Sequence, residues 1–155
     1  MTTTDQGEGK MPTTVKNRTV YQLANIAGCA PPDTLDSPGA RFLLRVQDSA
    51  RELVENAKPD EDLTDAIHEH ADAAVPIYTR DMWATFVDLA AYEEDVTEYG
   101  PIEDMGQAAQ VALYMIAERL LRTLVEEART EEAQTYMLAE RLLRTLAEKT
   151  RTADD

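Results

Sequence analysis

The C-terminal third of the chain constrains the fold most, because it contains neither glycine nor proline after Gly106. These two residues are the strongest breakers of regular helices. Apolar residues recur through this part at three- and four-residue spacing, which is typical of an amphipathic helix. Pro101 suits a first helical position, and Glu103 and Asp104 would follow in the first turn, where the helix dipole favours acids. The sequence therefore predicts a long C-terminal helix.

This region also contains an internal repeat. Residues 114–124 read YMIAERLLRTL and residues 136–146 read YMLAERLLRTL. The offset of 22 residues is close to six helical turns, so both copies would present nearly the same face of one helix. Two arrangements follow: one continuous helix, or a break near residues 130–134 with the second copy folding back. We expect the continuous helix.

The remaining chain also indicates helices, so the predicted fold is all-α. Residues 1–36 are predicted to be a largely disordered lead with a short helix at about 19–28. Ser37 and Pro38 suit the N-cap and first position of a longer helix, which Pro59 would stop. We expect a small helical domain over residues 37–128. Residues 129–155 would extend the long C-terminal helix and contain the second copy of the repeat.

Nearly all of the net charge of −15 lies between Asp60 and Asp104. This segment has fourteen acidic residues and a single basic residue, Arg80, whereas residues 1–59 contain seven of each kind. A charge this localised favours a basic partner surface. Two other interpretations are a merely solvated face and an adaptation to high salt. Adaptation to high salt would spread acidic residues over the whole surface, but residues 1–59 have no net charge.

A carboxylate stripe is predicted on a helix from Asp60, as its cap, to about Ala74. On a helical wheel the acids from Glu61 to Asp72 share one face, opposite Ile67 and Ala71. Six acids along a helix of about 20 Å give roughly one charge per 3.3 Å. One strand of B-DNA carries one phosphate per about 3.4 Å.

The next predicted helix, from Thr79 to about Tyr92, is apolar over about 220° of its circumference at 100° per residue. A surface helix of a monomer needs an apolar stripe of only about 100°. The pattern therefore indicates burial on two sides or a subunit interface. We expect Met82, Trp83 and Phe86 to lie at the interface of a homodimer, with ordinary core packing as the alternative.

The sequence offers little for catalysis or metal binding. His68, Glu69 and His70 lie between Asp65 and Asp72, but no HExxH motif is present, and the chain has no further histidine. No nucleophile motif or phosphate-binding loop is present, so we expect neither an enzyme nor a cofactor. The lone Cys29 cannot form an internal disulfide, which fits a cytoplasmic protein. No apolar run approaches the ~20 residues of a membrane span, and the acidity disfavours direct binding of nucleic acid.

One segment is similar to a known family. Glu61 to Pro76, EDLTDAIHEHADAAVP, resembles the DxxDAIHxxADxxVP stretch of the Ocr-type phage anti-restriction proteins, which mimic DNA. The likeness extends over about residues 44–126. It implies an all-α homodimer whose carboxylates stand in for DNA phosphates, and apolar dimer contacts at Trp83 and Phe86. The very acidic C-terminal segment of that family has no counterpart in the nearly neutral residues 105–155.

The predicted function is therefore that of a DNA-mimic inhibitor. It would occupy the DNA-binding cleft of a type I-like restriction-modification enzyme or another basic DNA-binding protein. The alternative is a helical protein–protein interaction or assembly module without DNA mimicry. The candidate phosphate mimics are Asp60, Glu61, Asp62, Asp65, Glu69, Asp72, Asp81, Asp88, Glu93, Glu94, Asp95, Glu98, Glu103 and Asp104.

Overall fold

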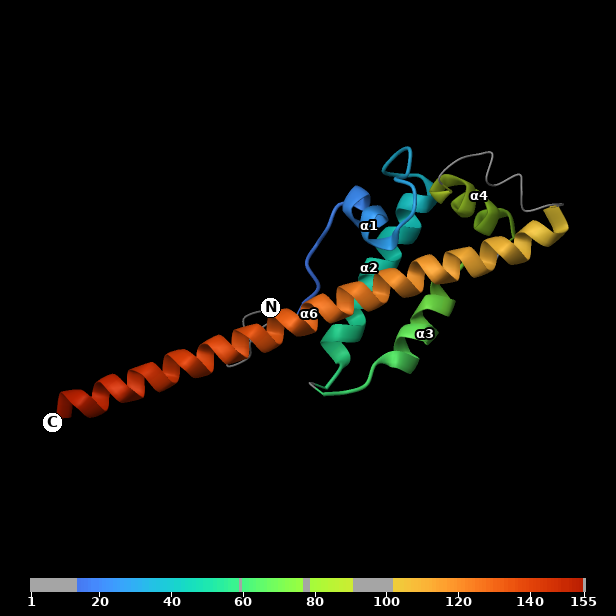
Figure 1. Ribbon diagram of the computed structural model, residues 1–155. Coiled ribbons are helices and arrows are strands. Elements are labelled where there is room, and N and C mark those ends of the chain that lie inside the picture. Colours follow the sequence, from blue (N-terminus) through green and yellow to red (C-terminus); the bar gives the residue numbers. More distant parts are fainter. Residues whose placement is uncertain (1–13, 59, 77–78, 91–101, 155) are drawn as a thin grey trace, which may run out of the picture.

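In the part of the chain that the structure describes, four helices pack against one end of a single long helix (Figure 1). The computed structural model describes residues 14–58, 60–76, 79–90 and 102–154. With the labels of Figure 1, the helices are α1 (Val20–Ala27), α2 (Pro38–Asn56), α3 (Thr64–Ala74), α4 (Thr79–Leu89) and α6 (Ile102–Asp154). All the regular structure in the described residues is helical, as the sequence predicts. None of the described helices combines the length and apolar character needed to cross a membrane.

α1 has both ends that its sequence predicts. The Thr19 hydroxyl accepts a hydrogen bond from the Gln22 backbone N–H, while the Gln22 side chain accepts one from the Thr19 N–H, which forms a capping box. Gly28 ends the helix with a left-handed φ of 76°. Arg119 of α6 donates from Nη1 to the Ala27 carbonyl oxygen at 3.1 Å. This bond ties the C-terminus of α1 to α6.

α2 confirms the predicted start at Ser37 and Pro38, because the Ser37 hydroxyl accepts from the Ala40 N–H at 3.2 Å. Its buried face includes Phe42, Leu43 and Val46. These side chains join buried residues of all the other helices in one core. α2 therefore forms the main support for α6 within the body of the molecule.

α6 is continuous, so the arrangement in which the second copy folds back is not the one observed. Its first part lies on the body and buries Leu113, Leu120, Leu121 and Leu124. Its C-terminal part projects beyond the body as a single helix (Figure 1). Arg129 and Glu131 of α6 make polar contacts to the body, through the Lys58 carbonyl oxygen and the Lys16 ammonium group.

The predicted disordered lead needs correction where the structure describes it. Residues 14–18 are extended and lie against the body, with the Val15 side chain buried. The Arg18 backbone N–H donates to Gln47 Oε1 at 2.9 Å, and the Arg18 guanidinium group pairs with Glu127 at 2.7 Å. One apolar anchor and several polar contacts of Lys16, Asn17 and Arg18 therefore hold a segment whose composition gives no helical signal. Residues 1–13 lie outside the described residues.

α3 begins at Thr64 and not at Asp60, which is a second correction. Leu63 is buried before the helix, and the Asp62 carboxylate accepts hydrogen bonds from the Thr64 N–H at 3.0 Å and the Thr64 hydroxyl at 2.7 Å. Asp62 therefore satisfies the first helical amide from outside the helix. Asp60 and Glu61 lie in the connection that precedes it.

Candidate functional site

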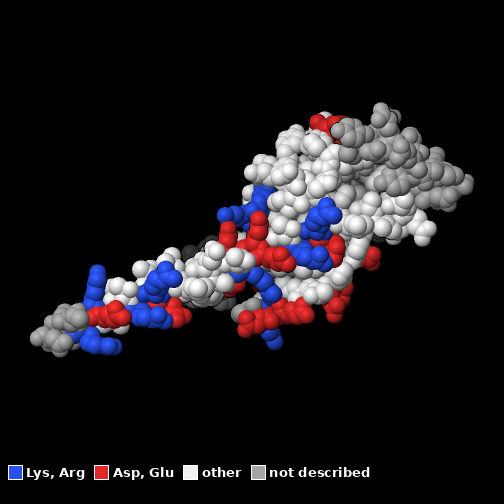
Figure 2. All heavy atoms as spheres, viewed as in Figure 1, with Lys and Arg blue, Asp and Glu red and all other residues white. Residues whose placement is uncertain are grey.

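Six exposed carboxylates form one face of the molecule, which we call the acidic surface. Its members are Asp60, Glu61, Asp62, Asp65, Glu69 and Asp72. Three of them precede α3 and three lie on its outer side. In Figure 2, acidic side chains gather along the lower edge of the body, where Figure 1 places α3 and the connection before it.

The helical part of the acidic surface follows from the amphipathic pattern of α3. Ile67, Ala71 and Ala74 are buried against the body, so residues on the opposite side of the helix face solvent. Asp65 and Asp72 are seven residues apart, or about 10 Å along the axis. With Glu69 between them, the helix carries roughly one carboxylate per 5 Å. This density is lower than the one per 3.3 Å predicted for a helix starting at Asp60, because the other three acids precede the helix.

Four of these carboxylates have no polar partner in the part of the chain that the structure describes. No ion pair or hydrogen bond reaches the side chains of Asp60, Asp65, Glu69 or Asp72 within those residues. The ion pairs found there use other acids, namely Asp48, Glu118, Glu127, Glu131 and Glu140. The acidic surface therefore keeps its charge available to an external cation or basic side chain.

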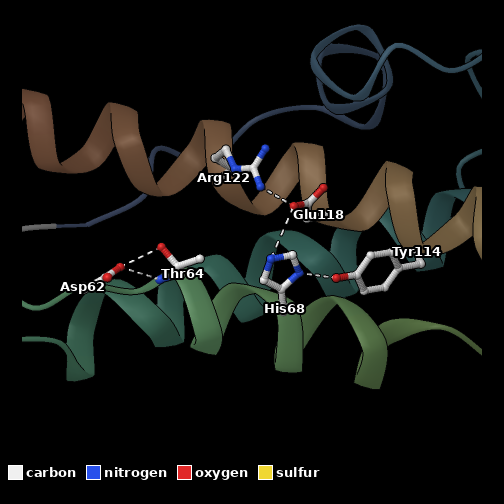
Figure 3. Close-up of polar contacts among 6 residues, drawn as sticks. All are labelled: Asp62, Thr64, His68, Tyr114, Glu118 and Arg122. Carbon is white, nitrogen blue, oxygen red and sulfur yellow. Dashed lines mark hydrogen bonds and ion pairs between the residues drawn. The ribbon is translucent and has the colours of Figure 1, made fainter.

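A polar seam between α3 and α6 orients the acidic surface (Figure 3). The His68 ring stacks on Tyr114 with centroids 6.1 Å apart and is bonded through Nδ1 to the Tyr114 hydroxyl. His68 Nε2 lies 3.8 Å from a Glu118 carboxylate oxygen, and that oxygen also pairs with Arg122. These contacts fix the rotation of α3 about its axis. They keep the outer side of α3 turned toward solvent.

The two histidines of α3 have different environments. His68 is half-exposed and contacts two residues of α6. His70 is half-buried. The described residues contain no group of three or more histidines, cysteines or acids that could hold a metal ion. Nothing in the sequence pattern pointed to Tyr114 and Glu118 as partners of His68.

Arginines border the acidic surface on the side of α6. A hollow between α3 and α6 is lined by Asp62, Thr64, Arg122 and Arg129. The hydrogen bonds from the Thr64 side chain and backbone lower the pKa of Asp62, and the positive charge of Arg129 acts in the same direction. Asp62 is therefore held by its own neighbours, as is Glu61, whose carboxylate accepts from the Lys58 N–H at 3.0 Å. On α3 itself, the open part of the surface begins at Asp65.

Asp88 has a structural position that sequence reasoning missed. Its Oδ2 accepts from the Gly39 N–H at 2.8 Å, in the first turn of α2, and its Oδ1 accepts from the Asp33 N–H at 3.5 Å. A carboxylate at a helix N-terminus satisfies a free amide and complements the dipole. Asp88 therefore joins α4 to α2 and does not belong to the open acidic surface. Asp81 is exposed on α4, in a hollow that also contains Arg41 and Arg45.

The structure does not describe the side chains of the six other predicted phosphate mimics. Glu93, Glu94, Asp95 and Glu98 fall outside the described residues. Glu103 and Asp104 are in the first turns of α6, but their side chains are not among those described. The six residues of the acidic surface and Asp81 are therefore the predicted mimics that the structure places in solvent.

The residues predicted for a dimer interface lie on α4. Met82 and Phe86 are buried within the chain itself, at 7% and 6% exposure, and Trp83 is half-buried. The Trp83 and Phe86 rings lie 5.5 Å apart. Within one chain, α4 therefore uses these side chains to pack on the core, and only part of Trp83 remains for a second molecule. The interface at α4 stays a prediction.

Compared with known proteins, the chain matches no family model, no curated protein and no solved structure. The likeness of Glu61–Pro76 to the Ocr-type proteins thus stays a prediction from the residues.

Proposed function

We propose that the acidic surface mimics a short stretch of nucleic-acid backbone and blocks a DNA-binding enzyme. The partner would be a protein whose DNA-binding cleft is lined with lysine and arginine, such as a type I-like restriction-modification enzyme. The observation that carries this proposal is the set of exposed carboxylates that have no partner among the described residues, Asp60, Asp65, Glu69 and Asp72. Carboxylates that repel one another without compensation reduce stability. A role in binding would account for their presence.

The charge density of the surface predicts how binding should respond to salt. Duplex DNA carries one charge per about 1.7 Å of axis and binds proteins with a steep loss of affinity as salt rises. The carboxylates of α3 lie roughly 5 Å apart along its axis, so they should condense fewer counterions than DNA does. Added salt should therefore weaken this protein's binding less than it weakens DNA binding. Its advantage as a competitor should grow with salt.

The test is competition between this protein and a labelled DNA duplex on a type I methyltransferase core, at two salt concentrations. The triple variant Asp65→Asn, Glu69→Gln, Asp72→Asn should lose displacement while its far-UV circular dichroism stays unchanged. A matched control removes three negative charges elsewhere, on exposed residues, through Asp33→Asn, Asp36→Asn and Glu140→Gln. Equal displacement by the two variants would mean that net charge alone acts and would refute a defined binding surface.

A second candidate function is a helical interaction or assembly module. The observation that favours it is the projecting part of α6, where Leu142, Leu143 and Leu146 are all more than half exposed. Deleting residues 132–155 should abolish partner binding under this hypothesis and leave it intact under charge mimicry. The triple variant on α3 should abolish partner binding under charge mimicry and leave it intact under the assembly hypothesis.

A further inference from the structure

The projecting part of α6, residues 132–151, carries an apolar face that no other described part of the chain covers. We call this face the α6 stripe; its members are Tyr136, Leu138, Ala139, Leu142, Leu143 and Leu146. Its four leucines are 55–67% exposed. Charged residues, including Glu140, Arg141 and Arg144, occupy the opposite side of the helix wheel. Helices in proteins owe most of their stability to packing of such a face. We therefore expect another helix to cover the α6 stripe.

The first copy of the repeat shows that this face is built to pack on helices. Leu142, Leu143 and Leu146 correspond to Leu120, Leu121 and Leu124, which are 0–1% exposed against the body. The two eleven-residue copies differ only at Ile116 and Leu138. The same side chains in the same register therefore pack against other helices in the first copy and are exposed in the second copy.

The body cannot cover the second copy as well. The surface formed by α1, α2 and α3 is already filled by the first copy in each chain. If the second copy displaced the first, one stripe would become buried only by exposing another of nearly identical sequence. Pairing of two α6 stripes from two chains is the arrangement that buries both without displacing anything. Isologous pairs of this kind are also the commonest symmetry of soluble oligomers.

The position of the body then sets the direction of pairing. The two copies are 22 residues apart, which at 100° per residue rotates the second by only about 40° from the first. The stripe and the body therefore lie on nearly the same side of α6. In a parallel pair, the partner helix would run back along that side into the body, which is in contact with α6 as far as Glu131. In an antiparallel pair, the two bodies lie at opposite ends.

We propose that two copies of this chain associate through their α6 stripes as an antiparallel helix pair, with the two-fold axis between Leu142 and Leu143. Residue 132 of one chain would then lie opposite residue 153 of the other. The overlap begins where the body ends. The inference rests on the second candidate function, for which it names the partner, and it is independent of charge mimicry. It places the interface on α6, away from Met82, Trp83 and Phe86.

The first experiment measures mass by sedimentation velocity over roughly a hundredfold range of concentration, because association shifts with concentration. The full chain should move from 17.3 kDa toward twice that value. Leu143→Glu should weaken association about a hundredfold, since burying one leucine is worth about tenfold and each dimer contains the change twice. The matched control is Met137→Glu, because Met137 is 62% exposed and lies on the opposite side of the helix. It should associate like the parent chain.

The second experiment tests direction by disulfide formation. In the antiparallel pair, position 139 lies opposite position 146, so a mixture of Ala139→Cys and Leu146→Cys chains should form mixed disulfides. Ala139→Cys alone should not cross-link to itself, whereas in a parallel pair it would. The native Cys29 should not compete, because burial raises its pKa to about 11 and keeps the thiol protonated.

The outcomes separate this proposal from the functions above. A mass of 17.3 kDa at every concentration, or equal weakening by Leu143→Glu and Met137→Glu, overturns the homodimer. The assembly function survives that result if deletion of residues 132–155 still abolishes binding to another protein. Self-linking of Ala139→Cys overturns the antiparallel arrangement alone. Weakening by Trp83→Ala without any effect of Leu143→Glu would move the interface to α4.

Discussion

The two copies of the repeat permit an internal comparison of one substitution in two environments. Leu121 and Leu143 occupy the same position in the two copies, within one continuous helix. Leu121 is 0% exposed and Leu143 is 67% exposed. Because both changes replace leucine by alanine within the same local sequence, RLLRT, they alter helix propensity equally. The difference between their effects therefore measures burial against the body.

Leu121→Ala should lower the free energy of unfolding by about 3–4 kcal/mol, within the range of 2.7–5.0 kcal/mol found for buried leucines in another protein. The loss combines the transfer free energy of the deleted carbons with the cavity they leave. Leu143→Ala should stay within about 0.5 kcal/mol, as is usual for exposed positions. For a chain of this size 1 kcal/mol corresponds to roughly 2–4 °C. The melting temperatures of the two variants should thus differ by about 10 °C.

The assay is thermal and urea unfolding monitored by circular dichroism, at a concentration low enough to leave the chain monomeric. The urea slope should be the same for both variants, since neither change alters how much surface unfolding exposes. Equal losses at Leu121 and Leu143 would mean that the second copy is packed like the first and would refute the projecting helix. Negligible loss at both would refute the docking of the first copy on α1–α3.

Three further predictions concern side chains that the fold positions. Asp88→Ala should cost about 1–2 kcal/mol in urea unfolding, because the Gly39 N–H loses a charged acceptor at the start of α2; no loss would refute this anchoring role. Gly28→Ala should cost about 1 kcal/mol in the same assay, because φ is 76° there, and a gain in stability would contradict the left-handed cap. Thr64→Ala should raise the pKa of Asp62 toward its usual value, as followed by carboxyl NMR titration. Because folding lowers this pKa, the stabilisation by Asp62 is present above pH 3.8 and is lost as the pH falls further; an unchanged pKa would exclude the Thr64 hydroxyl as a cause.

Local signals in the sequence were sufficient for the helices that have strong ends. Thr19 with Gln22, Gly28, and Ser37 before Pro38 are each recognisable from residue type and spacing, and the structure uses them as caps. The long C-terminal helix followed from the absence of breakers after Gly106. These features depend on interactions between residues at most a few positions apart, which is why one sequence can reveal them.

Other features depend on contacts distant in sequence, and these were missed. Asp60 resembles a helix cap, yet α3 starts at Thr64 because Leu63 is drawn into the core. Asp88 shares a polar wheel face with Asp81, but it binds an amide 49 residues away in α2. Residue spacing alone cannot distinguish a carboxylate that anchors the fold from one that faces solvent. The carboxylates predicted on the outer side of α3 are exposed there, and their role as phosphate mimics stays a prediction. Asp88 instead joins α4 to α2.

The residues that flank the two copies explain why the first copy packs on the body and the second does not. Leu113, Val125 and Ala128 extend the apolar face of the first copy at both ends, and each is at most 4% exposed. The residues 22 positions later are Thr135, Ala147 and Thr150, which are smaller or polar and all exposed. Burial against α1–α3 requires an apolar face longer than the eleven shared residues. The Thr135 and Thr150 hydroxyls donate to carbonyl oxygens of their own helix, but burial would still remove water from their oxygen atoms. The second copy keeps only the central leucines, a shorter face suited to one partner helix and not to the surface of a whole domain.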